Sequence, residues 1–207
     1  MANIKLTKNE QKAQRDHLAQ FLRYLPTLQL KKQQLQSVIT GINADLVQKQ
    51  TEREKMVAGL DDWVAVFAEN TIFEDRLKIE NIVQPDKVIC EYDNIAGVSI
   101  PVFKELTFKD IVYDVADYPL WVDTALIKLQ EIARLDALVK TLQTQVDLLG
   151  KELRSTSQRV NLFERVKIPE AKENIRVIGI YLGDQQTSAV VRGKIAKKKA
   201  QAKEEQQ

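Results

Sequence analysis

The sequence predicts a mostly α-helical protein: a long antiparallel two-helix coiled coil with a small β-hairpin insert in the middle. Two long heptad repeats, and a strand-rich stretch between them, indicate this class. Of 207 residues, only 7 are Gly and 5 Pro, while 29% are charged and 6% aromatic, a composition typical of long helices. We divide the chain into an N-terminal coiled-coil helix (1–70), a central insert with the hairpin (71–117), a C-terminal coiled-coil helix (118–191) and a basic tail (192–207).

The first helix is predicted from apolar residues that recur at alternating steps of three and four between about Lys8 and Asn70. With the register fixed on Leu18, twelve of fifteen a and d positions are apolar. Surface helices are shorter and drift against this repeat, so the pattern indicates a coiled coil. The a positions are Leu18, Leu25, Lys32, Ile39, Leu46, Arg53, Leu60 and Phe67, and the d positions are Phe21, Leu28, Leu35, Ile42, Lys49, Met56 and Trp63.

A second repeat begins at Tyr118, where Pro119 suits the first turn of a helix. Twelve of its fourteen a and d positions are apolar, so the two seams could pair along nearly their full length. Beyond Phe163 the pattern continues more loosely. The a positions are Tyr118, Ala125, Ile132, Val139, Val146, Leu153 and Val160, and the d positions are Trp121, Lys128, Leu135, Leu142, Leu149, Thr156 and Phe163.

The insert between the helices predicts a β-hairpin. The runs 87–92 and 98–103 are rich in β-branched and aromatic residues and bracket Asp93, Asn94 and Gly97, while Pro101 is tolerated only on an edge strand. Because the insert joins the two helices, we expect them to run antiparallel with the hairpin at the tip. A parallel homodimeric coiled coil is the competing arrangement, and the insert disfavours it because it would interrupt every chain.

Two details of this helix pair are also predicted: an ion pair between the helices and an effect of a proline. Lys49 is expected opposite Asp136, although a slip of one turn would place Arg53 there. A charged residue in the seam would penalise slipped alignments. Pro26 predicts a kink or a late start of the first helix.

The sequence offers no pattern for catalysis, a cofactor or a metal. Its glycines stand far apart, so neither common phosphate loop occurs, and one Cys with one His cannot form a zinc site. His17 has no nearby nucleophile, and Cys90 is expected to be a small apolar strand residue. We therefore predict a non-catalytic protein with no cofactor and no metal ligand.

Charge is balanced over the chain, with a net charge of +2, but residues 192–207 hold six basic and two acidic side chains. No aromatic residue follows Tyr181 to stack on bases, so we expect a protein partner and no nucleic acid; a frayed, solvated terminus is the alternative. Without a signal peptide or a membrane-spanning run, a cytoplasmic protein is expected. The basic residues expected to contact the partner are Arg192, Lys194, Lys197, Lys198 and Lys199.

One segment of the second helix carries a family resemblance. It contains Arg159, Val160, Asn161, Leu162, Phe163 and Glu164, followed by Ile168, Pro169 and Ile175. This order resembles the signature of the D subunit of V-type (vacuolar/archaeal-type) rotary ATPases. Leu6-Thr7-Lys8, the stretch 28–32 with Leu35, and Gly97-Val98 with Pro101 extend the resemblance over nearly the whole chain, and the tail resembles bacterial versions.

The resemblance implies the central rotor shaft of such an ATPase, which transmits torque between ATP hydrolysis or synthesis in the catalytic ring and ion transport through the membrane rotor. It implies that both termini lie inside the ring, and that the shaft is attached to the cell membrane only through the complex, with no direct insertion. The implied partners are the catalytic and non-catalytic ring subunits, the small F subunit, and a funnel-shaped protein above the membrane rotor. A prefoldin-like chaperone or scaffold is the alternative, disfavoured by the helix lengths and the motif at 159–169.

Overall fold

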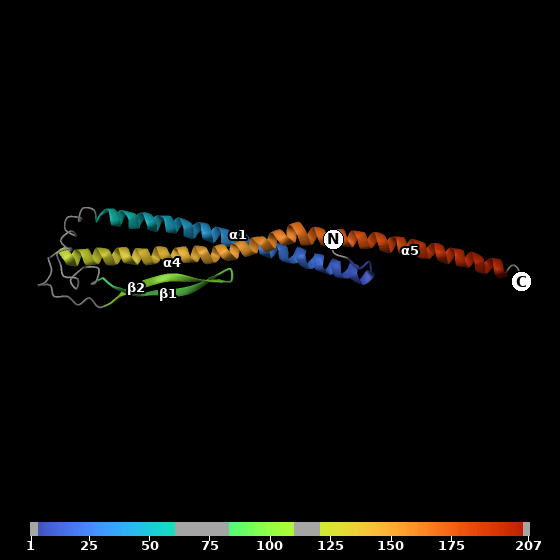
Figure 1. Ribbon diagram of the computed structural model, residues 1–207, viewed down its shortest axis with the longest axis horizontal. Coiled ribbons are helices and arrows are strands. Elements are labelled where there is room, and N and C mark those ends of the chain that lie inside the picture. The colour runs from blue at the N-terminus through green and yellow to red at the C-terminus, as the bar shows by residue number, and fades with distance from the viewer. Residues whose placement is uncertain (1–3, 61–82, 110–120, 205–207) are drawn as a thin grey trace. The chain divides into compact units, whose positions relative to one another are not determined.

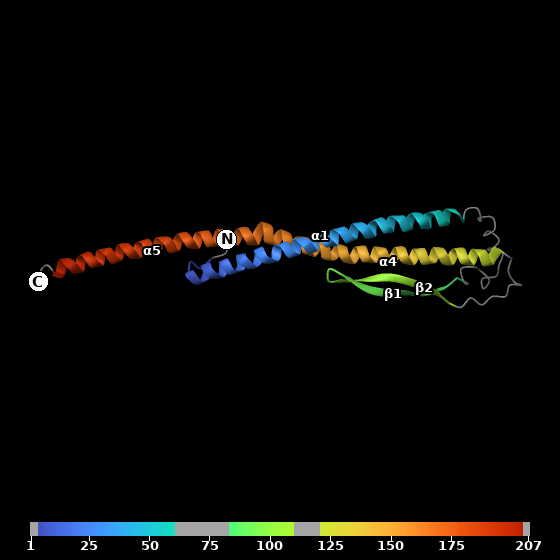
Figure 2. The same ribbon diagram turned by 180° about the vertical axis from the view of Figure 1, so that it is seen from behind.

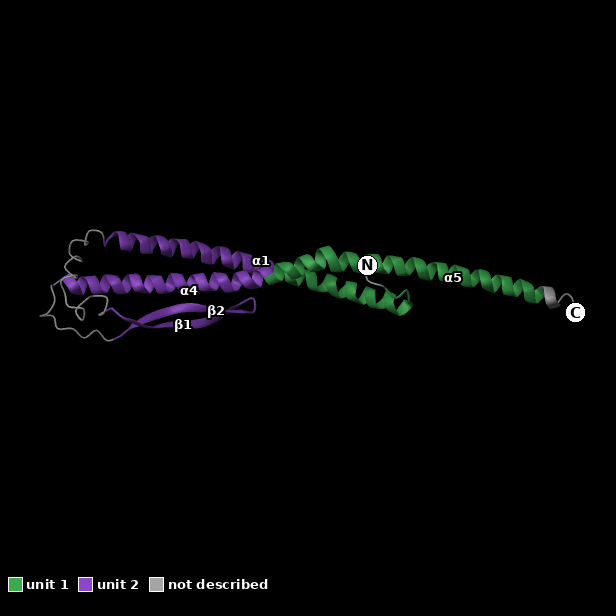
Figure 3. Ribbon diagram, in the orientation of Figure 1, with its two compact units in different colours: residues 1–31, 155–207 green, residues 32–154 purple. Residues whose placement is uncertain are grey.

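The computed structural model describes residues 4–60, 83–109 and 121–204. Its contacts divide the chain into unit 1, residues 1–31 and 155–207, and unit 2, residues 32–154 (Figure 3). The predicted helical class with a central hairpin is confirmed. The elements in chain order are α1 (Lys8–Ala58), β1 (Pro85–Ile95), β2 (Val98–Phe108), α4 (Trp121–Leu162), the π-helical turn η5 (Phe163–Lys167) and α5 (Ile168–Glu204) (Figure 1).

Helix α1 begins where the sequence provides a cap. The Thr7 hydroxyl accepts a hydrogen bond from the Glu10 backbone N–H at 3.2 Å, an arrangement that satisfies one of the free donors of the first turn. Pro26 therefore does not delay the start and lies inside the helix. The helix ends at Ala58. Residues 61–70 of the predicted first helix, with the seam residues Trp63 and Phe67, lie outside the described residues, as does Tyr118.

In unit 2, α1 and α4 pair antiparallel, as predicted, because the side chain of Arg53 reaches Asp136 while Leu35 packs in one cluster with Leu149. The Arg53 Nε lies 2.6 Å from the Asp136 Oδ1. The expected Lys49–Asp136 pair is wrong, and Lys49 instead pairs with Glu52 on its own helix at 2.7 Å. The apolar pattern repeats at every turn, so it did not distinguish these two registers.

Strands β1 and β2 form an antiparallel two-stranded sheet with Ile95 opposite Val98. The two residues between them, Ala96 and Gly97, have φ values of 51° and 82°, the positive pair that favours tight hairpin turns. The Gly97 backbone N–H also donates to the Asn94 side-chain oxygen at 2.9 Å. The predicted hairpin is thus confirmed and is longer than the expected runs.

The position of the hairpin differs from the expected tip. The hairpin lies along α4 in both views (Figures 1 and 2), and its residue Ile100, 2% exposed, packs in one cluster with Leu35 and Leu149, both 0% exposed. The Gln145 amide donates to the Pro101 carbonyl. Folding back onto the helices buries Ile100, which a projecting hairpin would leave in water.

Candidate functional site

Unit 1 consists of the first part of α1 paired with the chain from Ser155 onward. Two aromatic rings meet at one level of this pair, where the centroids of Phe21 and Phe163 are 5.2 Å apart. Nearer the start of α1, the Asn174 amide donates to the Gln14 side-chain oxygen at 3.3 Å. Both apolar and polar contacts therefore join this pair.

The π-helical turn η5 interrupts this stretch of helix. The Ile168 backbone N–H donates to the Phe163 carbonyl, a bond that spans five residues and widens the turn. At the start of the turn, the Glu164 carboxylate accepts a hydrogen bond from the Gln29 amide of α1. Pro169 follows immediately after the turn.

The family motif spans this turn, and its residues divide by exposure. Val160 and Ile168 are 4% and 8% exposed and belong to the core. Arg159, Asn161 and Pro169 are exposed, as is Glu164, although it is bonded to α1. The motif therefore combines packing residues with an outward polar surface.

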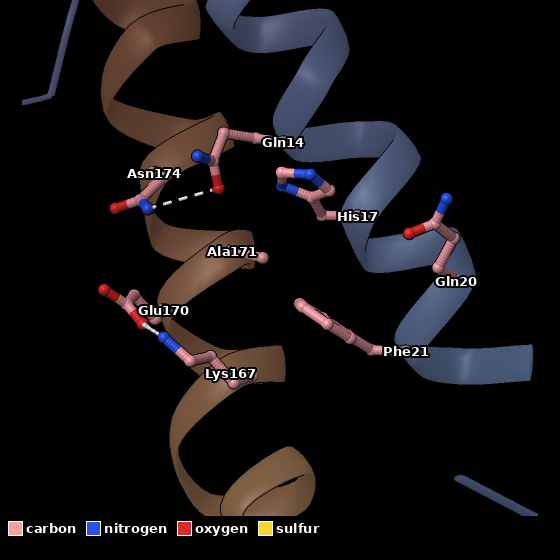
Figure 4. Close-up of a pocket in the computed structure, with 8 residues that line it drawn as sticks. All are labelled: Gln14, His17, Gln20, Phe21, Lys167, Glu170, Ala171 and Asn174. Atoms are coloured by element: carbon pink, nitrogen blue, oxygen red, sulfur yellow. Dashed lines mark hydrogen bonds and ion pairs between the residues drawn. The ribbon is translucent and has the colours of Figure 1, made fainter. Parts of the chain in front are cut away.

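A shallow cleft of about 460 Å³ lies between the two helices of unit 1 (Figure 4). The methyl group of Ala171 is small and leaves space opposite His17 and Phe21, while Lys167 pairs with Glu170 on the rim at 3.2 Å. No nucleophilic Ser, Thr or Cys lines the cleft, and the described residues include no group of three or more possible metal ligands. The lining residues are Gln14, His17, Gln20, Phe21, Lys167, Glu170, Ala171 and Asn174.

The predicted basic tail lies on α5, which continues past the start of α1 within unit 1 (Figure 1). The helix extends to Glu204, and all residues from 183 to 200 are exposed. The basic side chains share this surface with Val190, Val191 and Ile195, which are 58%, 50% and 52% exposed. We call residues 183–201 the basic extension, whose exposed surface carries both charged and apolar side chains.

The predicted apolar seam residues in the described part of the chain occupy covered positions, except Met56, which is 42% exposed. Leu35 and Leu149 are fully buried, and Ile39, Ile42 and Leu153 pack against their cluster. Further predicted seam residues are half-buried: Leu18, Leu25, Leu28, Leu46, Leu60, Ile132, Leu135, Val139, Leu142 and Val146.

A second contact face of α4 was missed from the sequence. Thr141 and Gln145, 8% and 6% exposed, lie off the seam, and Gln145 bonds to the hairpin. Leu148, also off the seam, packs against the cluster that contains Ile100. An apolar face wider than one partner helix can cover was the available signal.

Charged side chains on the helix surfaces form ion pairs that shift their pKa values. The hydrogen bond with Asp136 raises the pKa of Arg53, and the bond from Lys49 lowers the pKa of Glu52. Likewise, the bond from Arg176 lowers the pKa of Glu173. These groups are solvent-exposed, so the pairs stabilise local geometry only weakly.

The two helices with the docked hairpin define the class of the protein, a coiled coil with an inserted β-hairpin. None of the described helices has the length and apolar content needed to cross a membrane. The family model for the D subunit of ATP synthase matches residues 10–198. The chain belongs to this family, the ATP synthase D subunits, as the sequence resemblance predicted.

Curated relatives agree with this assignment. The chain is 48% identical over 197 residues to a protein of Borreliella burgdorferi named as the D subunit of V-type ATP synthase, and the match covers 95% of each chain. Proteins of the same name from Chlamydia abortus and Chlamydia felis are 33% and 34% identical over 208 residues, which cover 99% of this chain and 97% of each relative. These matches do not favour the prefoldin-like alternative.

Proposed function

We propose that this chain is the central rotor shaft of a V-type rotary ATPase and carries torque between ATP hydrolysis or synthesis in the catalytic ring and ion transport through the membrane rotor. In this role it is a non-catalytic component, cytoplasmic and peripheral to the cell membrane through the complex. The observation that carries the proposal is the helical basic extension, exposed from residue 183 to residue 200 in a chain of the ATP synthase D subunit family.

The chemistry of the extension suits a rotating contact. Lys197, Lys198 and Lys199 have flexible, strongly hydrated ammonium groups, which can exchange acidic partners as the shaft turns. Each exposed ion pair contributes only about 0–1 kcal/mol, so no single pair would lock the shaft at one angle. Several together would still centre it in the ring.

The proposed partners occupy different parts of the chain. The catalytic and non-catalytic ring subunits contact the extension, including Arg192 and Lys194, with both termini inside the ring. The small F subunit binds on the side of the shaft, and a funnel-shaped protein joins the shaft to the membrane rotor. Neither nucleic acid nor the lipid bilayer contacts the chain directly.

Deletion of residues 194–207 tests this arrangement. The truncated chain should fold and bind the F subunit, while its affinity for the ring and the coupled ATP turnover of the assembled complex should fall. Pull-down with each partner, at low and high salt, measures the two interactions separately. A truncated chain that loses the F subunit but keeps full ring binding would show that the termini do not lie in the ring.

A matched variant separates charge from helix length. Replacing Lys197, Lys198 and Lys199 with Gln retains the helix and removes three charges, so ring binding should weaken and depend less on salt. The corresponding Arg replacements keep the charge and should bind with nearly the original salt dependence. Equal behaviour of the Gln and Arg variants would contradict an electrostatic contact.

A further inference from the structure

The chain around η5 buries two sets of residues in unit 1, one set on each side of the turn. Within each set the residues are three or four positions apart, as a coiled-coil seam requires. Between Phe163 and Ile168 the step is five. The set before the turn is Thr156, Val160 and Phe163, and the set after it is Ile168, Ala171, Ile175, Ile178 and Leu182; all are buried or half-buried.

An uninterrupted heptad would place different residues against α1. Counting on from Phe163, the covered positions would be Lys167, Glu170, Asn174, Val177 and Tyr181. Of these, Glu170, Val177 and Tyr181 are exposed, and Val177 is 40% exposed. The covered face after the turn is therefore displaced by one residue from the face before it.

The bond from the Ile168 N–H to the Phe163 carbonyl accounts for this displacement, since a π turn holds one residue more than an α turn. We propose that η5 is a register insert: it takes up one surplus residue, so that both sets face α1. This role explains why the turn lies inside the 159–169 motif, and it does not depend on the proposed rotor function.

Pro169 offers a competing cause for the same turn. In a regular α-helix its ring would meet the Arg165 carbonyl, and its nitrogen has no hydrogen to donate. A π turn just before the proline relieves that contact. If the proline alone were the cause, Pro169→Ala would return the helix to α geometry and rotate the later set away from α1.

Two deletions in a Pro169→Ala background distinguish these causes. Deleting Val166, which is 48% exposed, removes one residue from the turn, so a continuous α-helix would then place both Phe163 and Ile168 against α1. The matched control deletes the exposed Gln158, in the α-helix before the turn. That chain has the same length, but a continuous helix would then bring Asn161 and Glu164 to α1 in place of Val160 and Phe163.

Two measurements on the full chain report the result. Thermal unfolding by circular dichroism reports stability. A disulfide between Gln11→Cys and Gly179→Cys, in a Cys90→Ala background, reports whether the later set still faces α1. A Cβ at Gly179 would lie 3.3 Å from the Gln11 side-chain nitrogen, whereas an uninterrupted heptad would turn position 179 away from α1.

We expect Pro169→Ala alone to keep the cross-link. The Val166 deletion in this background should cross-link equally well and melt within a few degrees of its parent, whereas the Gln158 deletion should melt roughly 10 °C lower because Val160 and Phe163 lose their contacts. Loss of the cross-link in Pro169→Ala would overturn the proposal. Equal destabilisation by the two deletions, or failure of the Val166 deletion to fold, would do the same.

Discussion

Leu149→Ala is the sharpest test of the packing in unit 2. Leu149 is fully buried and lies in one cluster with Leu35 of α1 and Ile100 of β2, so its side chain joins three elements. The substitution removes three buried carbons, which corresponds to about 2.4 kcal/mol of transfer free energy. The remaining cavity adds to this loss, so the free energy of unfolding should fall by about 2–5 kcal/mol.

Urea unfolding followed by circular dichroism measures this loss directly, and for a chain of this size each kcal/mol should lower the melting temperature by about 2–4 °C. Ile127→Ala is the matched control on the same helix, because Ile127 is 60% exposed and its truncation should cost roughly 0.5 kcal/mol or less. If Leu149→Ala were no more destabilising than Ile127→Ala, the hairpin would not be docked on the helix pair as the structure has it.

Four further predictions concern the surface, the turn and the chemistry. Arg53→Gln should remove the ion pair with Asp136. Because both side chains are more than 40% exposed, the coupling free energy measured in a double-mutant cycle should be small and should decrease with salt. Coupling that persisted at high salt would argue against a solvent-exposed pair. Ala96→Gly should stabilise the chain by about 0.5–1 kcal/mol, because the φ of 51° at Ala96 is unfavourable for L-residues; a lower urea midpoint would contradict the turn geometry. The hydrogen bond from Arg176 lowers the pKa of Glu173 from 4.5. The small contribution of this ion pair to stability is therefore present above pH 4.5 and is lost as the pH falls below it. The difference in stability between Glu173→Gln and the original chain should vanish in acid, and a difference unchanged by pH would refute the ion pair. The purified chain should not hydrolyse ATP, and turnover that survives removal of contaminating enzymes would refute the shaft role.

The pairing of the helices could be predicted from the sequence, but the ion pair between them could not. Apolar residues at steps of three and four identify which face of each helix is covered, and that face was predicted for α1 and α4. A shift of one turn leaves this apolar pattern nearly unchanged. The choice of Arg53 over Lys49 as partner of Asp136 depends on side-chain reach, which the pattern does not contain.

The hairpin was likewise predictable as an element but not in its position. Its β-branched runs and Gly97 indicate two strands and a turn regardless of what they pack against. Whether the strands project or dock depends on a second covered face on α4, which includes two polar residues, Thr141 and Gln145. Polar residues in a buried face weaken the periodic signal, so the docking face was missed.

The covered face of the helix is displaced by one residue at η5, and the sequence contains this displacement as the step of five between Phe163 and Ile168. From the heptad repeat alone, the step shows only that the apolar spacing becomes less regular after Phe163. Periodicity alone does not show whether a helix ends, drifts or inserts a residue at such a step. The structure resolves this because the chain stays helical through the step and the covered face continues on the far side.

Polar pairs set the alignment of the helices in both units. In unit 1 the Asn174 amide bonds to Gln14 and Gln29 bonds to Glu164, and in unit 2 Arg53 bonds to Asp136. Apolar side chains supply most of the attraction but tolerate a slip of one turn, whereas a slip would break each of these bonds, at a small cost for each solvent-exposed pair. For a shaft that carries torque, resistance to sliding matters as much as total stability, so these few polar pairs would serve the proposed function out of proportion to their energies.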